Sequence, residues 1–322
     1  MTNSWQNLIP DKCDWCPLAC GANRSIGDAG LCGADDKLYI ARSALHFWEE
    51  PPISGIIGGP KRDLGPGSGT IFFSNCNMKC VYCQNKEISG VDKSKGKNTS
   101  IDELVSMMLD LQSQGAMNIN LVTGTQYRSH LISAVRLARS QGLQLPIVWN
   151  TSGYESLASV YALNSTVDVW LTDFKYANND IASKFSGNNI NNYVDVALES
   201  LDAMASFNEK PKFDNFKENL RMTKGVVVRH MVLPGYIDNS KEVLKLLFEN
   251  FENSIKYSIM NQYTPVLDKN SKIAKSYPEL LQTVSQEEYE EVLNFADSLG
   301  IEDYYWQKGS TCSESFIPVW DL

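Results

Sequence analysis

Short apolar runs rich in β-branched and aromatic residues recur along most of the chain and alternate with amphipathic stretches. Runs of this kind predict buried β-strands. The predicted strands cover residues 70–74, 118–122, 147–150, 167–172, 226–232 and 258–262. The stretches between them carry apolar residues at helical spacing. They predict helices at 100–111, 128–141 and 154–163, an irregular helical stretch up to about 208, a helix after 239 and another at 285–299.

Residues at the predicted helix ends support these boundaries. Ser100 with Glu103 and Asn239 with Glu242 match the capping-box pattern, and Gly300 follows the last helix. Such regular alternation of strand and helix requires parallel strands joined by right-handed crossovers. Because six rather than eight units are present, the expected fold is α/β, a partial (β/α)6 TIM-like barrel.

The segment before the first strand has a different character. Residues 34–50 predict a short amphipathic helix that ends at Pro51 and Pro52, and a Gly/Pro-rich connector follows. We therefore expect an N-terminal module with its lead-in helix at 1–50, a linker at 51–69, and a barrel with a C-terminal extension at 70–322.

Length and charge narrow the classes of function. The 322 residues are 43% hydrophobic, enough for one barrel-sized domain with a small appendage. A net charge of −9 and a pI near 5.0 argue against nucleic acid or an anionic membrane as the main partner. The N-terminus lacks a basic region followed by an apolar one, and no apolar run is long enough for a membrane helix. We expect a cytoplasmic protein.

The eight cysteines divide into groups of four, three and one. Cys76, Cys80 and Cys83 follow the first predicted strand in a C-x3-C-x2-C pattern. A closed zinc site needs four protein ligands, whereas a [4Fe-4S] cluster held by three cysteines leaves one iron open for reaction. A structural metal knuckle is the alternative.

The first four cysteines lie among Gly, Asp and Asn residues with little apolar periodicity. They are Cys13, Cys16, Cys20 and Cys32. Such a segment needs a metal to fold, and four thiolates suit either zinc or a second iron-sulfur cluster. Two roles are open for the metal site that these cysteines form. It is either a cluster that relays electrons or contacts substrate, or a structural metal site that covers one end of the barrel.

Polar residues follow every predicted strand. In a parallel β/α barrel the strand ends meet at one site, so these residues are candidate ligand contacts. Besides the cysteine loop they are Thr123-Gly124-Thr125-Gln126, Asn150-Thr151-Ser152-Gly153, Asp173-Phe174-Lys175, Arg229, His230 and Asn261-Gln262-Tyr263.

The pattern C-x3-C-x-aromatic-C after a strand, with Tyr82 as the aromatic residue, resembles the signature of radical S-adenosylmethionine (SAM) enzymes. Three sequence segments resemble a branch of this family that is related to the activating enzyme of pyruvate formate-lyase. They are GSGTIFFSNC, CVYCQN and ALHFWEEPPISG. The resemblance implies that the three cysteines bind three irons of a [4Fe-4S] cluster and that SAM chelates the fourth. It also implies reductive cleavage of SAM to methionine and a 5′-deoxyadenosyl radical.

The resemblance further implies SAM contacts at the strand ends. Gly124 lets the backbone approach the methionine amino group, although Thr125 departs from the acidic Gly-Gly-Glu-like pattern. Asn150 and Ser152 can bond the methionine or ribose, and Asp173 with Lys175 resembles the D-x-K pair of activating enzymes. Two further candidates are Arg229, which can pair with the SAM carboxylate or with a neighbouring acid, and His230, for which simple packing is the alternative.

The leading hypothesis is a radical SAM oxidoreductase of the activating-enzyme type. It abstracts hydrogen from a peptide or protein, including a backbone glycine, and takes electrons from a reductant such as flavodoxin or ferredoxin. The alternatives are a radical SAM enzyme acting on a small molecule and a non-catalytic iron-sulfur electron-transfer protein. His46 and Trp48 are expected to be a packed pair. Cys312 is expected to be a free thiol, or else to reach the barrel mouth as a cluster ligand or hydrogen-atom donor.

Overall fold

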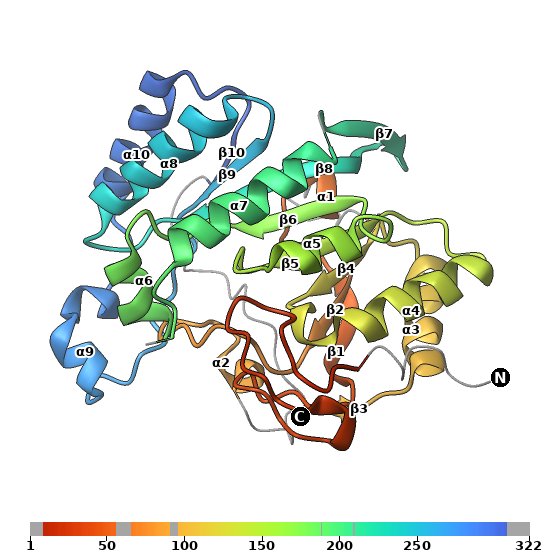
Figure 1. Ribbon diagram of the computed structural model, residues 1–322. Coiled ribbons are helices and arrows are strands. Elements are labelled where there is room, and N and C mark those ends of the chain that lie inside the picture. The colour runs from red at the N-terminus through yellow and green to blue at the C-terminus, as the bar shows by residue number, and fades with distance from the viewer. Residues whose placement is uncertain (1–8, 56–65, 91–95, 188, 209, 308–322) are drawn as a thin grey trace.

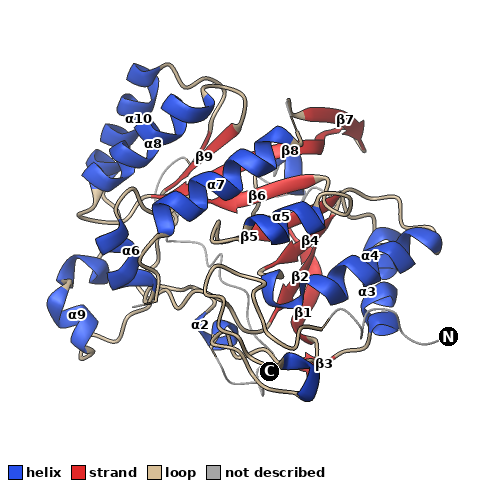
Figure 2. Cartoon of the chain, viewed as in Figure 1, coloured by secondary structure: helices blue, strands red, loops and turns tan. Residues whose placement is uncertain are grey.

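Six parallel strands form the centre of one sheet, and their spatial order follows their order in the chain. The computed structural model describes residues 9–55, 66–90, 96–187, 189–208 and 210–307 (Figures 1 and 2). The six strands are β2 (Ser68–Phe73), β4 (Ile119–Val122), β5 (Ile147–Thr151), β6 (Val169–Asp173), β8 (Asn219–Met231) and β9 (Lys256–Met260). The predicted α/β fold is therefore confirmed.

Additional strands lie beside this parallel core. On one side β1 (Tyr39–His46) pairs antiparallel with β2, and β3 (Lys97–Asn98) pairs with β1. On the other side β10 (Tyr305–Trp306) pairs parallel with β9. Within the described ranges the strand order thus runs from β3 to β10 and has two ends. The sheet is curved and open.

The longer helices cover one face of the sheet, as Figure 1 shows for α4, α5 and α7. None of the helices in the described ranges is long and apolar enough to cross a membrane. The longer helices are α3 (Ile101–Ser113), α4 (Arg128–Ser140), α5 (Leu157–Leu163), α6 (Asn179–Ser186), α7 (Tyr193–Ser206), α8 (Ile237–Phe251) and α10 (Gln286–Leu299). Short ones are α1 (Pro51–Ser54), α2 (Lys86–Ser89) and α9 (Lys272–Ser276).

Alternation along the strands divides the core in two. Trp149 and Trp170 belong to the large core cluster that the helices complete. Their chain neighbours Val148 and Val169 face the other way and pack with Ile53 of α1. Because successive side chains on a strand point to opposite faces, one face of the sheet packs on helices and the other encloses α1. The short helix α1 therefore covers part of the sheet face that the longer helices leave free.

The lead-in helix predicted within residues 34–50 is wrong. Residues 39–46 form β1, whose backbone pairs with β2 over the register Ile40↔Phe73 to His46↔Ser68. Pairing with a buried strand outweighs the helical propensity of this segment, which contains Ala41 and Ala44. Pro51 and Pro52 begin a helix rather than end one, because proline is tolerated in the first turn.

Other boundaries were predicted with mixed success. The predicted capping box of Ser100 with Glu103 is present, and Gly300 ends α10 with φ +86° as expected. A second capping box, of Ser285 with Glu288, begins α10. The capping box at Asn239 is wrong: α8 begins at Ile237, and the Asn239 side chain instead accepts from the backbone N–H of Ala177.

The polar insertion before the fifth predicted strand contains an additional strand. Here β7 (Lys212–Phe216) pairs antiparallel with the first half of β8, which explains why β8 begins at Asn219 rather than at residue 226. The alternation of apolar residues is weak in this hairpin, so sequence alone did not reveal it.

Replacing Ile53 by alanine should lower the free energy of unfolding by about 2–5 kcal/mol, because it leaves a cavity inside the barrel. Ile53 is fully buried against Val148, Leu171 and Val227. The matched control is Ile26→Ala, since Ile26 is 74% exposed; its effect should stay within about 0.5 kcal/mol. Urea unfolding measures both, and equal effects of the two substitutions would contradict this packing.

Candidate functional site

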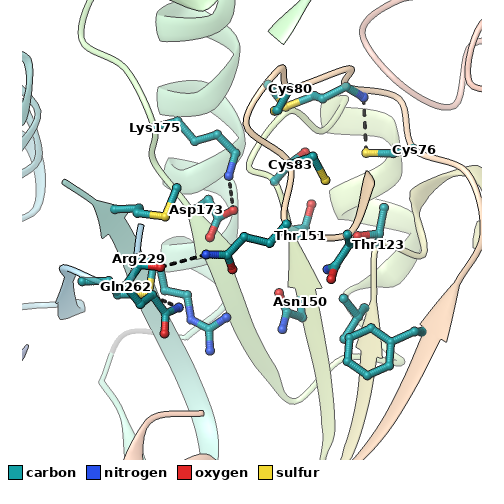
Figure 3. Close-up of a pocket in the computed structure, with 18 of the residues that line it drawn as sticks. Cys76, Cys80, Cys83, Thr123, Asn150, Thr151, Asp173, Lys175, Arg229 and Gln262 are labelled. Atoms are coloured by element: carbon teal, nitrogen blue, oxygen red, sulfur yellow. Dashed lines mark hydrogen bonds and ion pairs between the residues drawn. The ribbon is translucent and has the colours of Figure 1, made fainter. Parts of the chain in front are cut away.

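A cavity of ≈ 230 Å³ opens at the carboxyl ends of the parallel strands. Figure 3 shows the three cysteines on one side of it, with Asp173 and Lys175 beside them and Asn150 and Arg229 further in. Nine of the residues predicted for the site line it: Cys76, Cys80, Tyr82, Cys83, Asn150, Ser152, Asp173, Lys175 and Arg229. The expected convergence of strand ends on one site is present for these residues.

The cysteine loop is fixed by backbone contacts to the end of α6. The N–H of Lys79 donates to the carbonyl of Ser186 at 3.0 Å, and the N–H of Val81 donates to the carbonyl of Phe185 at 2.8 Å. The loop leaves β2 through Asn75, which has φ +71°. Asparagine tolerates this left-handed conformation better than most residues, and it turns the chain toward the cavity.

The Cys80 sulfur is the end of a buried row of hydroxyl groups. Its Sγ lies 3.1 Å from Ser186 Oγ, which lies 2.8 Å from the Tyr176 hydroxyl, and that hydroxyl is hydrogen-bonded to Tyr82. A metal-bound sulfur carries no proton, so Ser186 would then donate to it, with Tyr176 donating to Ser186 and Tyr82 to Tyr176. Sequence reasoning missed Ser186 and Tyr176, because neither lies at a strand end or in a motif.

The thiols of Cys76 and Cys80 hold their protons strongly in the absence of a metal. Burial and the neighbouring thiols raise the pKa of Cys76 to about 12, and burial raises the pKa of Cys80. Three sulfurs that face one cavity, with Ser186 ready to donate to one of them, fit a three-thiolate cluster with its fourth position toward the cavity.

Asp173 and Lys175 form an ion pair at the end of β6, next to the cysteine loop. Burial lowers the pKa of Lys175, but the Asp173 carboxylate and the nearby Cys80 thiol outweigh it and raise that pKa. Lys175 is therefore held as a cation beside a carboxylate. The pair offers one charge of each sign, which suits a ligand that carries both an ammonium and a carboxylate.

The sequence matches a family model described as the radical SAM superfamily over residues 70–247, more than half of the chain. The chain belongs to the radical SAM superfamily. Membership implies a [4Fe-4S] cluster and SAM binding, and the three thiols at the end of β2 are the residues that would hold the cluster.

The chain is also similar to individual proteins in sequence and in fold. The chain is 29% identical over 301 residues to the uncharacterized protein MJ0674 of Methanocaldococcus jannaschii, covering 91% of this chain and 77% of that protein. It is 24% identical over 224 residues to the pyruvate formate-lyase-activating enzyme of Clostridium pasteurianum, covering 66% and 83% respectively. A radical SAM methyltransferase from Sphaerobacter thermophilus shares the fold with a TM-score of 0.52 at 15% identity, covering 76% of this chain and 68% of that one.

Arg229 is held by acids rather than left free for a ligand. Its guanidinium donates to both oxygens of Glu50, at 2.8 and 2.7 Å, and to Glu49. The other oxygen of Glu49 accepts from Asn120 at 2.9 Å and from Asn150 at 3.5 Å. Of the two pairings predicted for Arg229, the structure shows the one with neighbouring acids.

This group of polar residues forms the floor of the cavity. Burial lowers the pKa of Arg229 and the two carboxylates raise it more strongly, so the arginine stays charged. Glu49 comes from the segment between β1 and α1 and lines the cavity together with His46 and Trp48. His46 packs edge-on against Phe72, with ring centroids 6.1 Å apart. His46 and Trp48 were expected to pack as a pair; the ring contact of His46 is with Phe72, and both His46 and Trp48 line the cavity.

Gly124 and Thr125 are predicted SAM contacts that do not line the cavity. A Cβ on Gly124 would lie 2.5 Å from Leu131 and 2.9 Å from Trp149, so this glycine permits close packing between β4 and its neighbours. Thr125 donates to the buried carboxylate of Glu155 at 2.6 Å, and burial raises the pKa of Glu155. At this strand end the cavity is lined by Thr123.

His230 likewise faces away from the cavity. Its Nδ1 donates to the carbonyl of Phe174 at 2.8 Å, which leaves Nε2 to accept from Ser240 at 2.9 Å. Arg229 and His230 are neighbours on one strand, so they necessarily point to opposite faces. The strand end alone could not decide which of the two would reach the ligand.

The four N-terminal cysteines line a second, smaller cavity. Burial raises the pKa of Cys16 to about 12. Burial also raises the pKa of Cys32, where the positive charges of Arg24 and Lys79 act in the opposite direction. Within the described residues, no three Cys, His, Asp or Glu side chains lie close enough to hold a single metal ion. Cys312 lies outside the described residues.

Replacing Arg229 by methionine should lower the free energy of unfolding by about 3–5 kcal/mol, because two buried carboxylates lose their counter-charge. Arg221→Met, on the same strand, is the matched control. Arg221 pairs with Asp214, whose side chain is 43% exposed, and its loss should cost about 1 kcal/mol or less. Urea unfolding measures both variants. If Arg229→Met and Arg221→Met lower the free energy of unfolding equally, a buried ion pair at the floor of the cavity is contradicted.

His230 should make the protein less stable in mild acid. Burial lowers its pKa from 6.5 to about 4. As the pH falls from 6.5 toward 4, the unfolded chain takes up a proton that the folded chain excludes, and stability is lost at up to about 1.4 kcal/mol per pH unit. His230→Gln should flatten this part of the stability profile measured by urea unfolding between pH 7 and 4.5, relative to the parent protein. An unchanged slope would show that His230 titrates freely in the folded state.

Proposed function

We propose that this chain is a radical SAM oxidoreductase that cleaves SAM reductively and abstracts a hydrogen atom from a peptide or protein substrate. The observation that carries this proposal is that three thiols, an Asp–Lys ion pair and the polar ends of β5 and β6 face one cavity. The bound cluster and SAM supply one-electron chemistry. The chain's own residues bind these groups, orient them and exclude water.

Individual residues have distinct parts in this proposal. Lys175 can pair with the carboxylate of SAM and Asp173 with its ammonium, while Asn150 and Ser152 hydrogen-bond the methionine or ribose. Tyr82 supports the loop between Cys80 and Cys83 through its buried contacts with Tyr176. Gly124, Thr125 and His230 act behind the cavity, by packing.

The cavity wall opposite the cysteines suits a substrate. Trp48, Phe72, Met231 and Met260 supply apolar surface there, and Gln262 supplies an amide. Aromatic and thioether side chains adapt to varied substrate groups. Support for a protein substrate comes from the similarity to the pyruvate formate-lyase-activating enzyme, whose name gives a protein as its target. A backbone glycine is the proposed point of hydrogen abstraction, with a cytoplasmic flavodoxin or ferredoxin as reductant.

The anaerobically reconstituted protein, given dithionite and SAM, should produce 5′-deoxyadenosine, detected by chromatography and mass spectrometry. Cys76→Ala should reduce production to background, because one cluster ligand is lost. Size-fractionated cell extract then tests the substrate class: a macromolecular fraction should raise the yield.

Two results would contradict these statements separately. Equal yields from the parent protein and Cys76→Ala would refute SAM cleavage at this site. A rise that only the low-molecular-mass fraction produces would refute a peptide or protein substrate while leaving SAM cleavage intact.

A further inference from the structure

The N-terminal cavity brings together all four cysteines of a segment that the family model does not cover. Cys13, Cys16, Cys20 and Cys32 line it, and Trp15, Leu18 and Leu31 add apolar walls. Sulfur ligands in an apolar surrounding are typical of zinc and iron-sulfur sites, where the thiolates carry the negative charge.

Backbone hydrogen bonds hold the cysteines around this cavity. The N–H of Cys13 donates to the carbonyl of Ala22 at 3.0 Å, and the N–H of Gly21 donates back to the carbonyl of Cys13 at 2.9 Å. This reciprocal pair closes the loop that carries Cys16 and Cys20. These backbone hydrogen bonds help to place the cysteines around the cavity.

Gly30 leaves space beside two of the sulfurs. A Cβ at this position would lie 3.2 Å from Cys20 Sγ and 3.5 Å from Cys32 Sγ. A side chain at this position would crowd both sulfurs. The glycine therefore permits the close approach of the chain to Cys20 and Cys32.

Positive charge lies next to the same sulfurs. Arg24 is 1% exposed, donates to the main-chain oxygen of Gln126 at 2.7 Å and to that of Asp35, and lies 4.6 Å from the Trp15 ring centroid. The acceptors are main-chain oxygens, and the Arg24 side chain also lines the cavity, so its positive charge lies next to the thiols. A thiolate-bound cluster beside Cys32 would place a negative charge next to this buried cation.

One lysine joins the two cysteine sets. Lys79 Nζ donates to the main-chain oxygen of Cys32 at 3.2 Å and to that of Cys76 at 2.8 Å. Asn77, the residue after Cys76, also lines the N-terminal cavity. The two sites therefore lie next to each other, and Leu31, which also lines the N-terminal cavity, is 51% exposed.

We propose that Cys13, Cys16, Cys20 and Cys32 bind a second [4Fe-4S] cluster and that electrons enter the protein there. A reduced flavodoxin supplies one electron to this cluster and is itself oxidised by one electron. That electron crosses the N-terminal site toward the Cys76 site; no covalent bond forms or breaks and no proton moves. Only the destination of the electron rests on the proposed function, since the N-terminal cluster itself is inferred from this cavity alone.

Iron and acid-labile sulfide measured on the anaerobically reconstituted parent protein test the site. About eight of each per chain are expected if both sites are filled, and about four in the triple variant Cys76→Ala/Cys80→Ala/Cys83→Ala. Four iron with one zinc per chain in the parent protein would overturn the proposal, as would four iron with no second metal. Because the parent protein alone gives this answer, a variant that fails to fold does not decide it.

Electron entry is tested by electron paramagnetic resonance of the Cys76 site after rapid mixing, without SAM or substrate. Reduced flavodoxin should reduce that site in the parent protein and at least tenfold more slowly in Cys20→Ser, whereas dithionite should reduce it equally in both. Equal rates with flavodoxin would overturn the role in electron entry. If neither flavodoxin nor dithionite reduces the Cys76 site in Cys20→Ser, the role in electron entry is also overturned, because the N-terminal metal would then be structural. Neither result depends on whether the substrate is a peptide.

Discussion

The buried contact between Arg229 and the two acids Glu49 and Glu50 connects the parts of this molecule that make the site. The arginine belongs to β8, which lies between β6 and β9, and the acids come from the segment that links β1 to α1. The contact lies between two layers on this face of the sheet. Below it Ile53 packs in an apolar layer, and above it the cavity is lined by polar strand ends. Because a buried ion pair needs both charges, the sheet and the lead-in segment must be in place together.

Much of this architecture could be predicted from sequence, because it follows from local periodicity. Three features depend on patterns within a few residues. They are the six parallel strands, the capping boxes at Ser100 and Ser285, and the convergence of the cysteines with Asp173 and Lys175. The predicted strand-end residues and the cysteine loop account for about half of the residues that line the cavity.

What escaped prediction depends on contacts between distant segments. Residues 39–46 look helical by composition, but β2 offers them a partner in the sheet. Ser186 lies 106 positions after Cys80, and no pattern in the sequence relates the two. The orientations of Arg229 and His230 depend on the register of β8, and a shift of one residue would exchange them. Such features are set by tertiary structure.

The central claim is that the cavity holds a three-cysteine [4Fe-4S] cluster to which SAM binds. The most direct measurement is the electron paramagnetic resonance spectrum of the reduced protein, in a Cys13→Ala/Cys16→Ala/Cys20→Ala/Cys32→Ala background, before and after SAM is added. The account predicts a cluster signal whose line shape changes with SAM, and its loss in the further variant Cys76→Ala. A cluster signal that SAM leaves unchanged at saturating concentration would contradict the account.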